Sequence, residues 1–518
     1  MNDPTLPEPT TGNPPKQPSL RRTASHGFFW MAATTGVGKA SAVAGQVALG
    51  WLLFNEDWGL YALTLSIAAF GQIVRGGGLG NIIIQRGAPA YDAISGPAFW
   101  MALAFNAAAA LVLVVAGRFA SHLYGHPELA PMLSVAALSY VVGAPAVILT
   151  AKLRADLAFK TLALIIALSS IARWACAIAL AATGAGAMSF VWAMVAASAV
   201  DSAAAWWATR DSPWMRPPAF ALWPGLYKSS VWLLISDFFQ ALAQKGDYLV
   251  LGMLVSLSIV GYYTFGYQLT AQIGVLLSMN VRSVLFPVLT RLVDEPRRFA
   301  NAADKTLGVL VLTGSAVSFL LLAVADPLEM VIWGGKWQDA VPVMQVFAAV
   351  VPIRLMMTVP ASTLLAKGRF GLTALMMFVQ AVCLVTAAFV GGTLFESNAG
   401  MIAAVVGVTQ SLFHFTSCLL VLRSAGCQVR KIAWSSLKPW LVASAVGIGA
   451  VMVDGAFLID LHPIVRCGLI AGGYATVYLA LARLLLSRHL ESLSSLLPRR
   501  IDRMYRGALF LPKGGLVG

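Results

Sequence analysis

The sequence predicts an all-α polytopic membrane protein with about fourteen transmembrane helices. Three observations lead to this fold class. Apolar residues make up 58% of the 518 residues, charged residues only 11%, and the apolar residues gather into long runs. Soluble domains usually contain roughly 45–50% apolar and roughly 25% charged residues. So few charges cannot cover a water-exposed surface, and we expect most of the surface to face lipid.

A transmembrane helix needs about 20 predominantly apolar residues. The runs that meet this length are residues 27–53, 58–74, 95–117, 128–150, 160–183, 188–209, 228–254, 258–285, 305–325, 341–365, 370–392, 399–422, 434–453 and 463–486. Residues 1–26 are polar and rich in proline, without the short apolar core of a signal peptide, so we expect a disordered cytoplasmic tail. Residues 487–518 form a basic tail after the last run.

Lysine and arginine are distributed very unevenly about these spans. With the N-terminus inside, and with most basic residues near span ends counted with the adjoining loop, 27 of the 36 basic residues are assigned to inner loops and tails, 3 to outer loops and 6 to the spans. Basic residues collect on the cytoplasmic side of membrane proteins. The sequence therefore predicts an even number of spans, with both termini in the cytoplasm. The net charge of +14 follows from this bias and does not indicate nucleic acid as a partner.

A short internal repeat divides the chain. Trp30 lies 29 residues before Gly59, which begins Gly-Leu-Tyr, and Trp232 lies 29 residues before Gly261, which begins Gly-Tyr-Tyr. Both marks recur after 202 residues, or six spans, so the repeat is parallel. Parallel repeats are a transporter architecture with the substrate site at their interface. We therefore expect two six-helix lobes related by a pseudo-two-fold axis, followed by two additional helices: residues 27–209, 228–422 and 434–486.

Several segments resemble a known transporter family. They are GLGNIIIQR (Gly78–Arg86), LRADLAFK (Leu153–Lys160), Asp247-Tyr248, GYYTFGYQL (Gly261–Leu269) and Phe286-Pro287. In this order and spacing, from about Gly27 to Arg423, they are similar to the Wzx-like oligosaccharide flippases. This polysaccharide biosynthesis branch belongs to the multidrug/oligosaccharidyl-lipid/polysaccharide exporter superfamily.

The resemblance implies a V-shaped transporter in the bacterial cytoplasmic (inner) membrane. Its cargo would be an oligosaccharide on a lipid diphosphate, moved from the inner to the outer leaflet for exopolysaccharide or lipopolysaccharide biosynthesis. Such a protein is not an enzyme and uses neither ATP nor another cofactor. The partners implied are membrane lipids and, beyond the substrate itself, a glycan polymerase and export machinery.

Charged residues within the spans are the candidates for function. An intramembrane Lys or Arg costs about 2.5–3.5 kcal/mol at a helix centre, so we expect these side chains to face a wet cavity or a partner. The spans hold three acidic residues, Asp201, Asp237 and Asp247, and six basic residues: Lys39, Arg75, Arg173, Lys245, Arg282 and Arg354. The predicted substrate-binding residues are Lys39, Arg75, Lys245, Gln272, Arg282 and Arg354. Asp237 is the candidate for a coupling ion, and no metal or catalytic residue is predicted.

A purely structural role remains an alternative for each of these residues. Arg75 and Arg282 lie near span ends and can snorkel to the membrane surface. Arg173 and Arg354 can pair with an aspartate or cap carbonyls. Glutamines near the basic residues can hydrogen-bond between helices without touching a substrate.

Two other functions compete with flipping. A drug/cation antiporter would need an acidic cavity, whereas the spans hold twice as many basic as acidic residues. A membrane glycan polymerase or ligase would need an outer catalytic loop, and the predicted outer loops are all short. Both observations favour the flippase.

Overall fold

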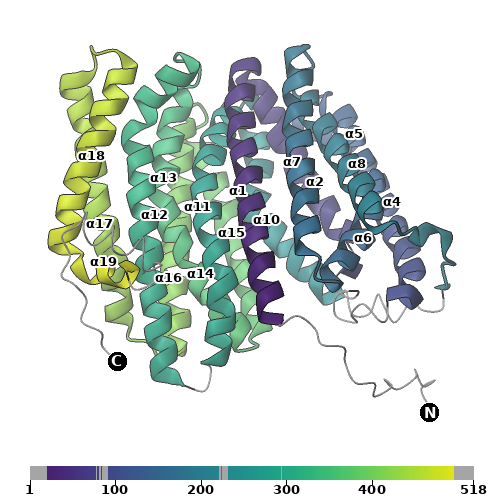
Figure 1. The fold of residues 1–518 in the computed structure, drawn as a ribbon. Helices are drawn as coiled ribbons and strands as arrows, with labels where there is room; N and C mark the ends of the chain where they lie inside the picture. Colours follow the sequence, from purple (N-terminus) through teal and green to yellow (C-terminus); the bar gives the residue numbers. More distant parts are fainter. Residues whose placement is uncertain are drawn as a thin grey trace.

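The computed structural model describes residues 20–76, 79–80, 83, 91–220, 223, 231–292 and 295–494, and these residues form helices with no strand (Figure 1). The chain is thus a multi-pass α-helical protein, and each predicted span coincides with one long helix or one bent helix pair. The outermost residues of both predicted tails, 1–19 and 495–518, and most of the Gly78–Arg86 segment lie outside the described residues.

The first half of the chain contains six predicted spans. Its helices are α1 (Leu20–Leu52), α2 (Asn55–Gly76), α4 (Tyr91–Tyr124), α5 (Leu129–Val142), α6 (Ala144–Ala155), α7 (Phe159–Ala182) and α8 (Met188–Thr209). Helix α1 begins seven residues before the predicted span, two residues after Pro18, the last proline of the tail. Helices α5 and α6 meet at a bend of 42°, where Pro145 removes a backbone donor. A 3-10 turn, η2 (Pro213–Met215), follows this half.

The second half contains the remaining spans. Its helices are α10 (Val231–Leu254), α11 (Leu257–Arg291), α12 (Pro296–Trp333), η4 (Gln338–Ala340), α13 (Val341–Met356), α14 (Thr358–Ala366), α15 (Phe370–Leu394) and α16 (Ala399–Ser424). The C-terminal helices are α17 (Val429–Val453), the π-helical turn η5 (Asp454–Leu458), α18 (Pro463–Leu485) and α19 (Ser487–Ser494). The start of the predicted basic tail is thus helical.

Hydropathy identifies most of the helices as candidates for crossing a membrane. Within the described residues, nine segments are each long and apolar enough to cross a membrane, and α5 with α6 forms a tenth. Helices α1, α2, α10 and α11 each have at least 22 residues, which is about 33 Å of helix, and part of the side chains of each lie outside the described residues. These four occupy corresponding places in the two halves, as the first two spans of each. The charged and polar residues within their apolar runs need a non-lipid environment.

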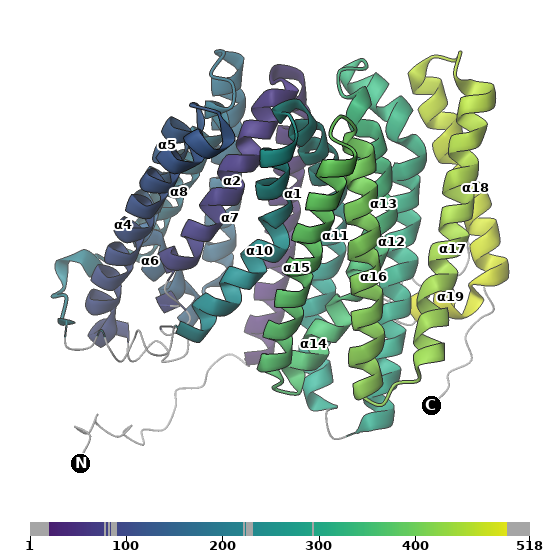
Figure 2. The ribbon, with the colours of Figure 1, turned by 180° about the vertical axis from the view of Figure 1, so that it is seen from behind.

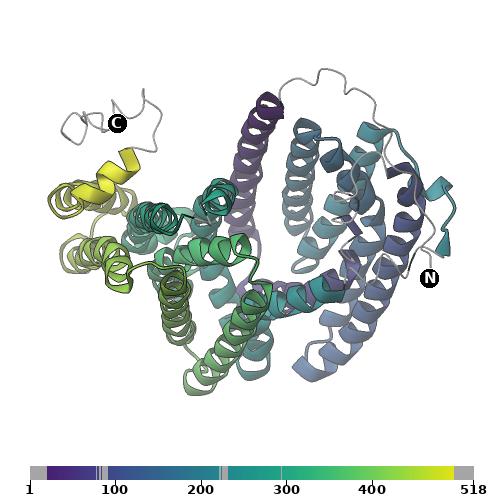
Figure 3. The same ribbon diagram turned by 90° about the horizontal axis from the view of Figure 1, so that it is seen from below.

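Helix packing repeats between the halves. Helix α1 packs on α7 as α10 packs on α15, α7 packs on α8 as α15 packs on α16, and α5 packs on α8 as α13 packs on α16. Seen along the bundle, the two groups of helices lie to either side of α1, α2 and α10, with α17 to α19 at the outer edge of the second group (Figures 2 and 3). The expected parallel repeat is thus present in the packing, and α2 and α11 form the contact that joins equivalent helices of the two halves.

Candidate translocation site between the halves

The two halves meet tightly at the end of the bundle where α1 turns into α2, which is at the top of Figure 1 and is called the closed end below. A Cβ atom added at Gly59 would collide with the carbonyl oxygen of Leu257, the first residue of α11. A Cβ atom added at Gly261 would collide with the carbonyl oxygen of Asn55, the first residue of α2. Asn55 and Leu257 are themselves 202 residues apart. The glycines that mark the sequence repeat therefore make a reciprocal backbone contact about the pseudo-two-fold axis.

Polar contacts reinforce this closure. Ser258 Oγ donates a hydrogen bond of 3.4 Å to Glu56 Oε1, and these residues are also 202 positions apart. Trp333 Nε1 donates to the carbonyl of Val47 at 3.1 Å, and Trp337 Nε1 donates to the carbonyl of Gly50 at 2.9 Å. The two tryptophan bonds tie the second half to the backbone of α1, and the serine bond ties it to a side chain of α2.

Aromatic rings fill the space behind these contacts. Phe265 stacks on Trp337 with ring centroids 3.8 Å apart, and Trp58 meets both rings edge to face. Tyr61 stacks on Phe190 at 3.9 Å. All five side chains are buried, so this end of the interface is packed with apolar groups that exclude water.

Away from the closed end, polar side chains join α1 to α11. Gln46 Nε2 donates to Gln268 Oε1 at 3.1 Å, and Lys39 Nζ donates to Gln272 Oε1 at 3.3 Å. Lys39 lies seven residues before Gln46, which is about 10 Å along the helix. Gln268 and Gln272 are one turn apart on α11. The structure thus brings together two predicted site residues, Lys39 and Gln272, across the interface of the two halves.

A second group of polar residues lies between α2 and α10. A cleft of about 330 Å³ is lined by Gln72 from α2 and by Asp237, Gln240, Gln244 and Lys245 from α10, with Leu65, Ala69, Ile73 and Ala241 completing its wall. The Lys245 ammonium lies 5.0 Å from the centre of the Tyr248 ring. The predicted coupling residue Asp237 and the predicted substrate contact Lys245 therefore share one cleft, which is separate from the Lys39–Gln272 contact.

Two further intramembrane charges, Arg354 and Asp247, have protein partners. Arg354 Nη1 donates to the Tyr267 hydroxyl at 2.8 Å, and its guanidinium lies against Gly274 of α11. Asp247 is buried and accepts a 2.9 Å hydrogen bond from the Tyr263 hydroxyl. The contacts of Arg354 favour a positioning role for this residue, which holds α13 on α11.

Two predicted site residues are placed only by their backbones. Arg75 lies in the last turn of α2 and Arg282 lies in the last third of α11. Both positions are far from the closed end. Their side chains lie outside the described residues, so their assignment as substrate contacts stays a prediction.

Sequence reasoning missed the residues that close the interface. Trp58, Trp333 and Trp337 were not among the candidates, and neither were Gln46 and Gln268 as a pair. The available signal was the Trp333-Gly334-Gly335-Lys336-Trp337 segment in a predicted outer loop. Two tryptophans around a flexible glycine pair are unusual for a simple connection, but only the fold shows that they reach α1.

Comparison with known proteins identifies the family. Residues 48–342, more than half of the chain, match the family described as "Polysaccharide biosynthesis protein". The chain belongs to this family. The match begins in the last turn of α1 and ends at the first residues of α13, so it includes the glycines Gly59 and Gly261 and the cleft between α2 and α10, but not Lys39 and Gln46 of α1.

Alignments with individual relatives cover most of this chain. It is 23% identical over 446 residues to the lipopolysaccharide biosynthesis protein WzxC of Escherichia coli (strain K12), and 22% identical over 454 residues to the teichuronic acid biosynthesis protein TuaB of Bacillus subtilis (strain 168). Each alignment covers 83% of this chain and 89% of the relative. The solved structure of the lipid II flippase MurJ, in an inward closed conformation, superposes with a TM-score of 0.67 at 11% identity, over 88% of this chain and 99% of that one. The two share a fold.

Proposed function

We propose that this protein moves a lipid-diphosphate-linked oligosaccharide from the inner to the outer leaflet of the cytoplasmic membrane, as a step in exopolysaccharide or lipopolysaccharide biosynthesis. Membership of the polysaccharide biosynthesis family supports the pathway, and the names of WzxC and TuaB point to the same kind of product. The likeness to MurJ supplies a fold in which such transport is carried out.

The observation that carries the proposal is the contact between Lys39 and Gln272 across the two halves. It lies below a tightly packed closure, on helices that carry polar and charged residues within their apolar runs. A diphosphate cannot enter a low-dielectric interior without partners. Lysine supplies a positive charge, and glutamine amides supply both donors and acceptors for sugar hydroxyls. Transport between two lobes, residues 27–209 and 228–422, then requires this contact to open and close.

The remaining assignments follow from this scheme. Arg75 and Arg282 would bind the diphosphate at the cytoplasmic mouth, where guanidinium groups can hold phosphate oxygens in pairs. Lys39, Gln272 and Lys245 would contact the cargo deeper in the membrane, and Arg354 would position α11. Asp237 would bind a coupling cation in the cleft beside Lys245. Export by Asp237→Asn that keeps an unaltered dependence on sodium or protons would exclude this role.

The proposal is tested in the bacterium from which the gene comes. In spheroplasts lacking the gene, radiolabelled lipid-linked oligosaccharide should accumulate and stay inaccessible to a membrane-impermeant lectin, and the wild-type gene should restore access. Normal lectin access without the gene would contradict flipping. Restored efflux of organic cations with no change in lectin access would support the antiporter instead.

A further inference from the structure

A cluster of basic side chains that the translocation scheme does not use lies at the opposite end from the closure, where α12, α17, α18 and α19 meet. Two adjoining pockets open there, with volumes of about 330 and 480 Å³. Their charged lining residues are one acid, Asp304, and four bases: Arg297, Lys305, Lys431 and Lys438. This end also carries the first residue of α1 and the last described helix, so it is the predicted cytoplasmic end.

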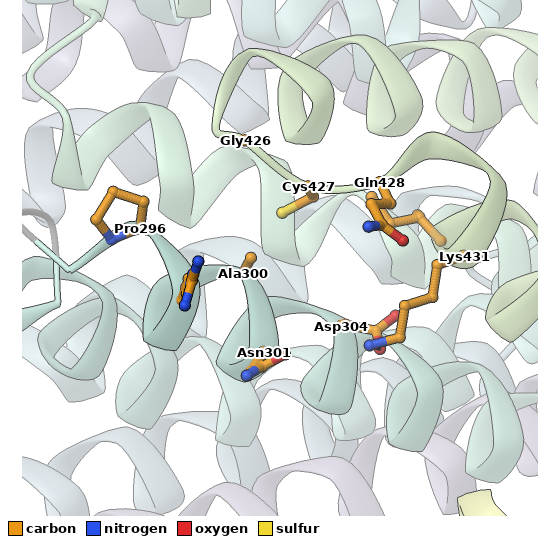
Figure 4. Close-up of a pocket in the computed structure, with 10 residues that line it drawn as sticks. Pro296, Ala300, Asn301, Asp304, Gly426, Cys427, Gln428 and Lys431 are labelled. Carbon is orange, nitrogen blue, oxygen red and sulfur yellow. Dashed lines mark ion pairs between the residues drawn. The ribbon is translucent and has the colours of Figure 1, made fainter.

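The single carboxylate is already satisfied. Asp304 Oδ2 lies 3.1 Å from Lys431 Nζ, and Asp304 Oδ1 accepts a 3.0 Å hydrogen bond from Ser435 Oγ. Figure 4, a close-up of the smaller pocket, shows Asp304 and Lys431 pointing toward one another. Both residues also line the larger pocket. Arg297, Lys305 and Lys438 form no ion pair with any other described residue. The pockets therefore hold an excess of three positive charges.

Neutral polar groups complete the lining. Ser435, Ser487, Ser492 and His489 face the larger pocket, and Asn301 and Gln428 face the smaller one. His489 Nε2 lies 2.9 Å from the carbonyl oxygen of Ser435, and burial lowers the pKa of His489. It is thus a neutral hydrogen-bonding group at pH 7. Hydroxyl, amide and ammonium groups together suit a phosphate ester with further hydroxyls.

The residues on the rim of the larger pocket indicate whether the phosphate ester belongs to a membrane lipid or to a soluble molecule. Trp434, Leu484 and Leu485 line this pocket with exposed fractions of 61%, 75% and 46%. Tryptophan is enriched at the membrane–water interface, and exposed leucines beside it suit contact with acyl chains. A pocket for a soluble anion has no need of large apolar side chains on its rim. Basic pockets between transmembrane helices on the cytoplasmic side are the form that phospholipid headgroup sites take.

We propose that these two pockets bind the headgroup of an anionic glycerophospholipid from the cytoplasmic leaflet. Lys305 of α12 and Lys438 of α17 contact the phosphate as point charges, and Arg297 reaches it from the smaller pocket. The bound lipid bridges α12 to the α17–α18 pair, which lies outside the repeated halves. This site is independent of the proposed transport function.

Binding is measured on the purified full-length protein in a neutral detergent, by native mass spectrometry and by thermal unfolding. Dioleoylphosphatidylglycerol should form a defined adduct and raise Tm, because a ligand that binds only the folded state stabilises it. Dioleoylphosphatidylcholine and inorganic phosphate should do neither. Each basic residue near an anionic lipid strengthens binding about fivefold. Lys305→Gln combined with Lys438→Gln should therefore weaken phosphatidylglycerol binding roughly thirtyfold.

Arg430→Gln is the matched control. Arg430 is exposed and lies one residue before Lys431 on α17, but lines neither pocket, so its removal should leave binding unchanged. If the double variant does not fold, Lys305→Gln alone carries the test with a loss of about fivefold. Equal binding of the two phospholipids, or an equal effect of Arg430→Gln, overturns the proposal. Binding of inorganic phosphate, or displacement of phosphatidylglycerol by undecaprenyl diphosphate, overturns it in favour of a soluble anion or the transported lipid.

Discussion

Lys39 has the most informative environment of any predicted site residue. Its ammonium is half-buried in the membrane region and reaches Gln272 in the other half of the molecule. A lysine needed only to join the halves would be replaceable by a neutral hydrogen-bond donor. A lysine that meets a diphosphate needs its charge. The contact alone is compatible with both roles, and substitutions that separate charge from hydrogen bonding distinguish them.

We predict that Lys39→Gln reduces glycan export about tenfold or more at wild-type protein abundance, because a hydrogen bond to a charged group contributes about 1.5–3 kcal/mol. Lys39→Arg should retain part of the export. Surface glycan per cell, divided by the amount of membrane-inserted protein, is the measurement. Arg369→Gln, which removes an exposed charge before α15, serves as the control and should export normally. Full export by Lys39→Gln would leave this lysine with a structural role only.

A different set of charges holds the start of the segment between the halves. Lys152 Nζ lies 3.2 Å from Asp211 Oδ2, and Arg216 Nη2 lies 3.1 Å from Asp211 Oδ1 and 3.0 Å from Asp92 Oδ1. Arg216 also bonds to Ser95 Oγ. Residues after α8 are thereby fixed to the first turn of α4 and the last turn of α6. The beginning of this segment is therefore packed against the first half.

We predict that Asp211 makes the protein sensitive to acid. Burial alone raises the pKa of Asp211, but its partners Tyr91, Lys152 and Arg216 outweigh burial and leave the pKa below its usual value. Such a group stabilises the folded state at pH values above the unfolded pKa, about 3.9, and this contribution is lost as the pH falls through the lower folded pKa. Asp211→Asn should lower Tm at pH 7 and flatten the decline of Tm below about pH 4. Identical Tm profiles for the two proteins between pH 7 and pH 3 would contradict this.

At the scale of the helix, the sequence predicts most of the structure. Long apolar runs locate the helices because the bilayer requires about 20 such residues, and the errors are at the ends, as at Leu20. The repeat also followed from sequence, since Gly59 and Gly261 occupy equivalent places. What the glycines do could not be predicted. Their close approach depends on how α2 and α11 cross, which is a property of the assembled bundle.

We predict that a side chain at either glycine opens the closed end. Overpacking costs about 1–3 kcal/mol, and here the obstacle is backbone carbonyl oxygen, which cannot rotate away. Gly59→Val should shift the population of the closed arrangement about tenfold, and Gly261→Val should do the same. The measurement is the rate at which an impermeant thiol reagent labels a cysteine placed at Gln46, in a chain whose five native cysteines are replaced by serine.

Gly472→Val is the matched control, because a Cβ atom at Gly472 of α18 meets nothing within 4 Å. It should label at the rate of the parent chain. Unchanged labelling in Gly59→Val would mean that the halves do not separate at this contact during transport, and that the glycines serve only to allow close packing.

At the scale of the whole molecule, some residues of the candidate site could be predicted from the sequence, whereas their neighbours in space could not. Lys39 and Lys245 were predicted because a charge in an apolar run is conspicuous. Their separation into two environments, one with Gln272 and one with Asp237, depends on which helix faces each of them. The spacing of residues along one helix predicts which of them share a face, but it does not predict which other helix packs against that face. The two pockets proposed to bind a phospholipid could not be predicted from the sequence for the same reason, since their basic residues come from two different helices, α12 and α17.

Orientation in the membrane is the last prediction, and helix α16 offers a matched pair of positions for it. Ser397 precedes this helix and Ser424 ends it. Both are exposed, and they are about 40 Å apart along the helix axis. The bias of 27 basic residues to 3 puts Ser424 in the cytoplasm and Ser397 outside. In intact cells carrying the protein without its native cysteines, an impermeant maleimide should label Ser397→Cys and not Ser424→Cys, and permeabilisation should expose the second. The opposite result would invert the protein and move the phospholipid pockets to the outer leaflet, whereas labelling of both in intact cells would remove α16 from the membrane-spanning helices.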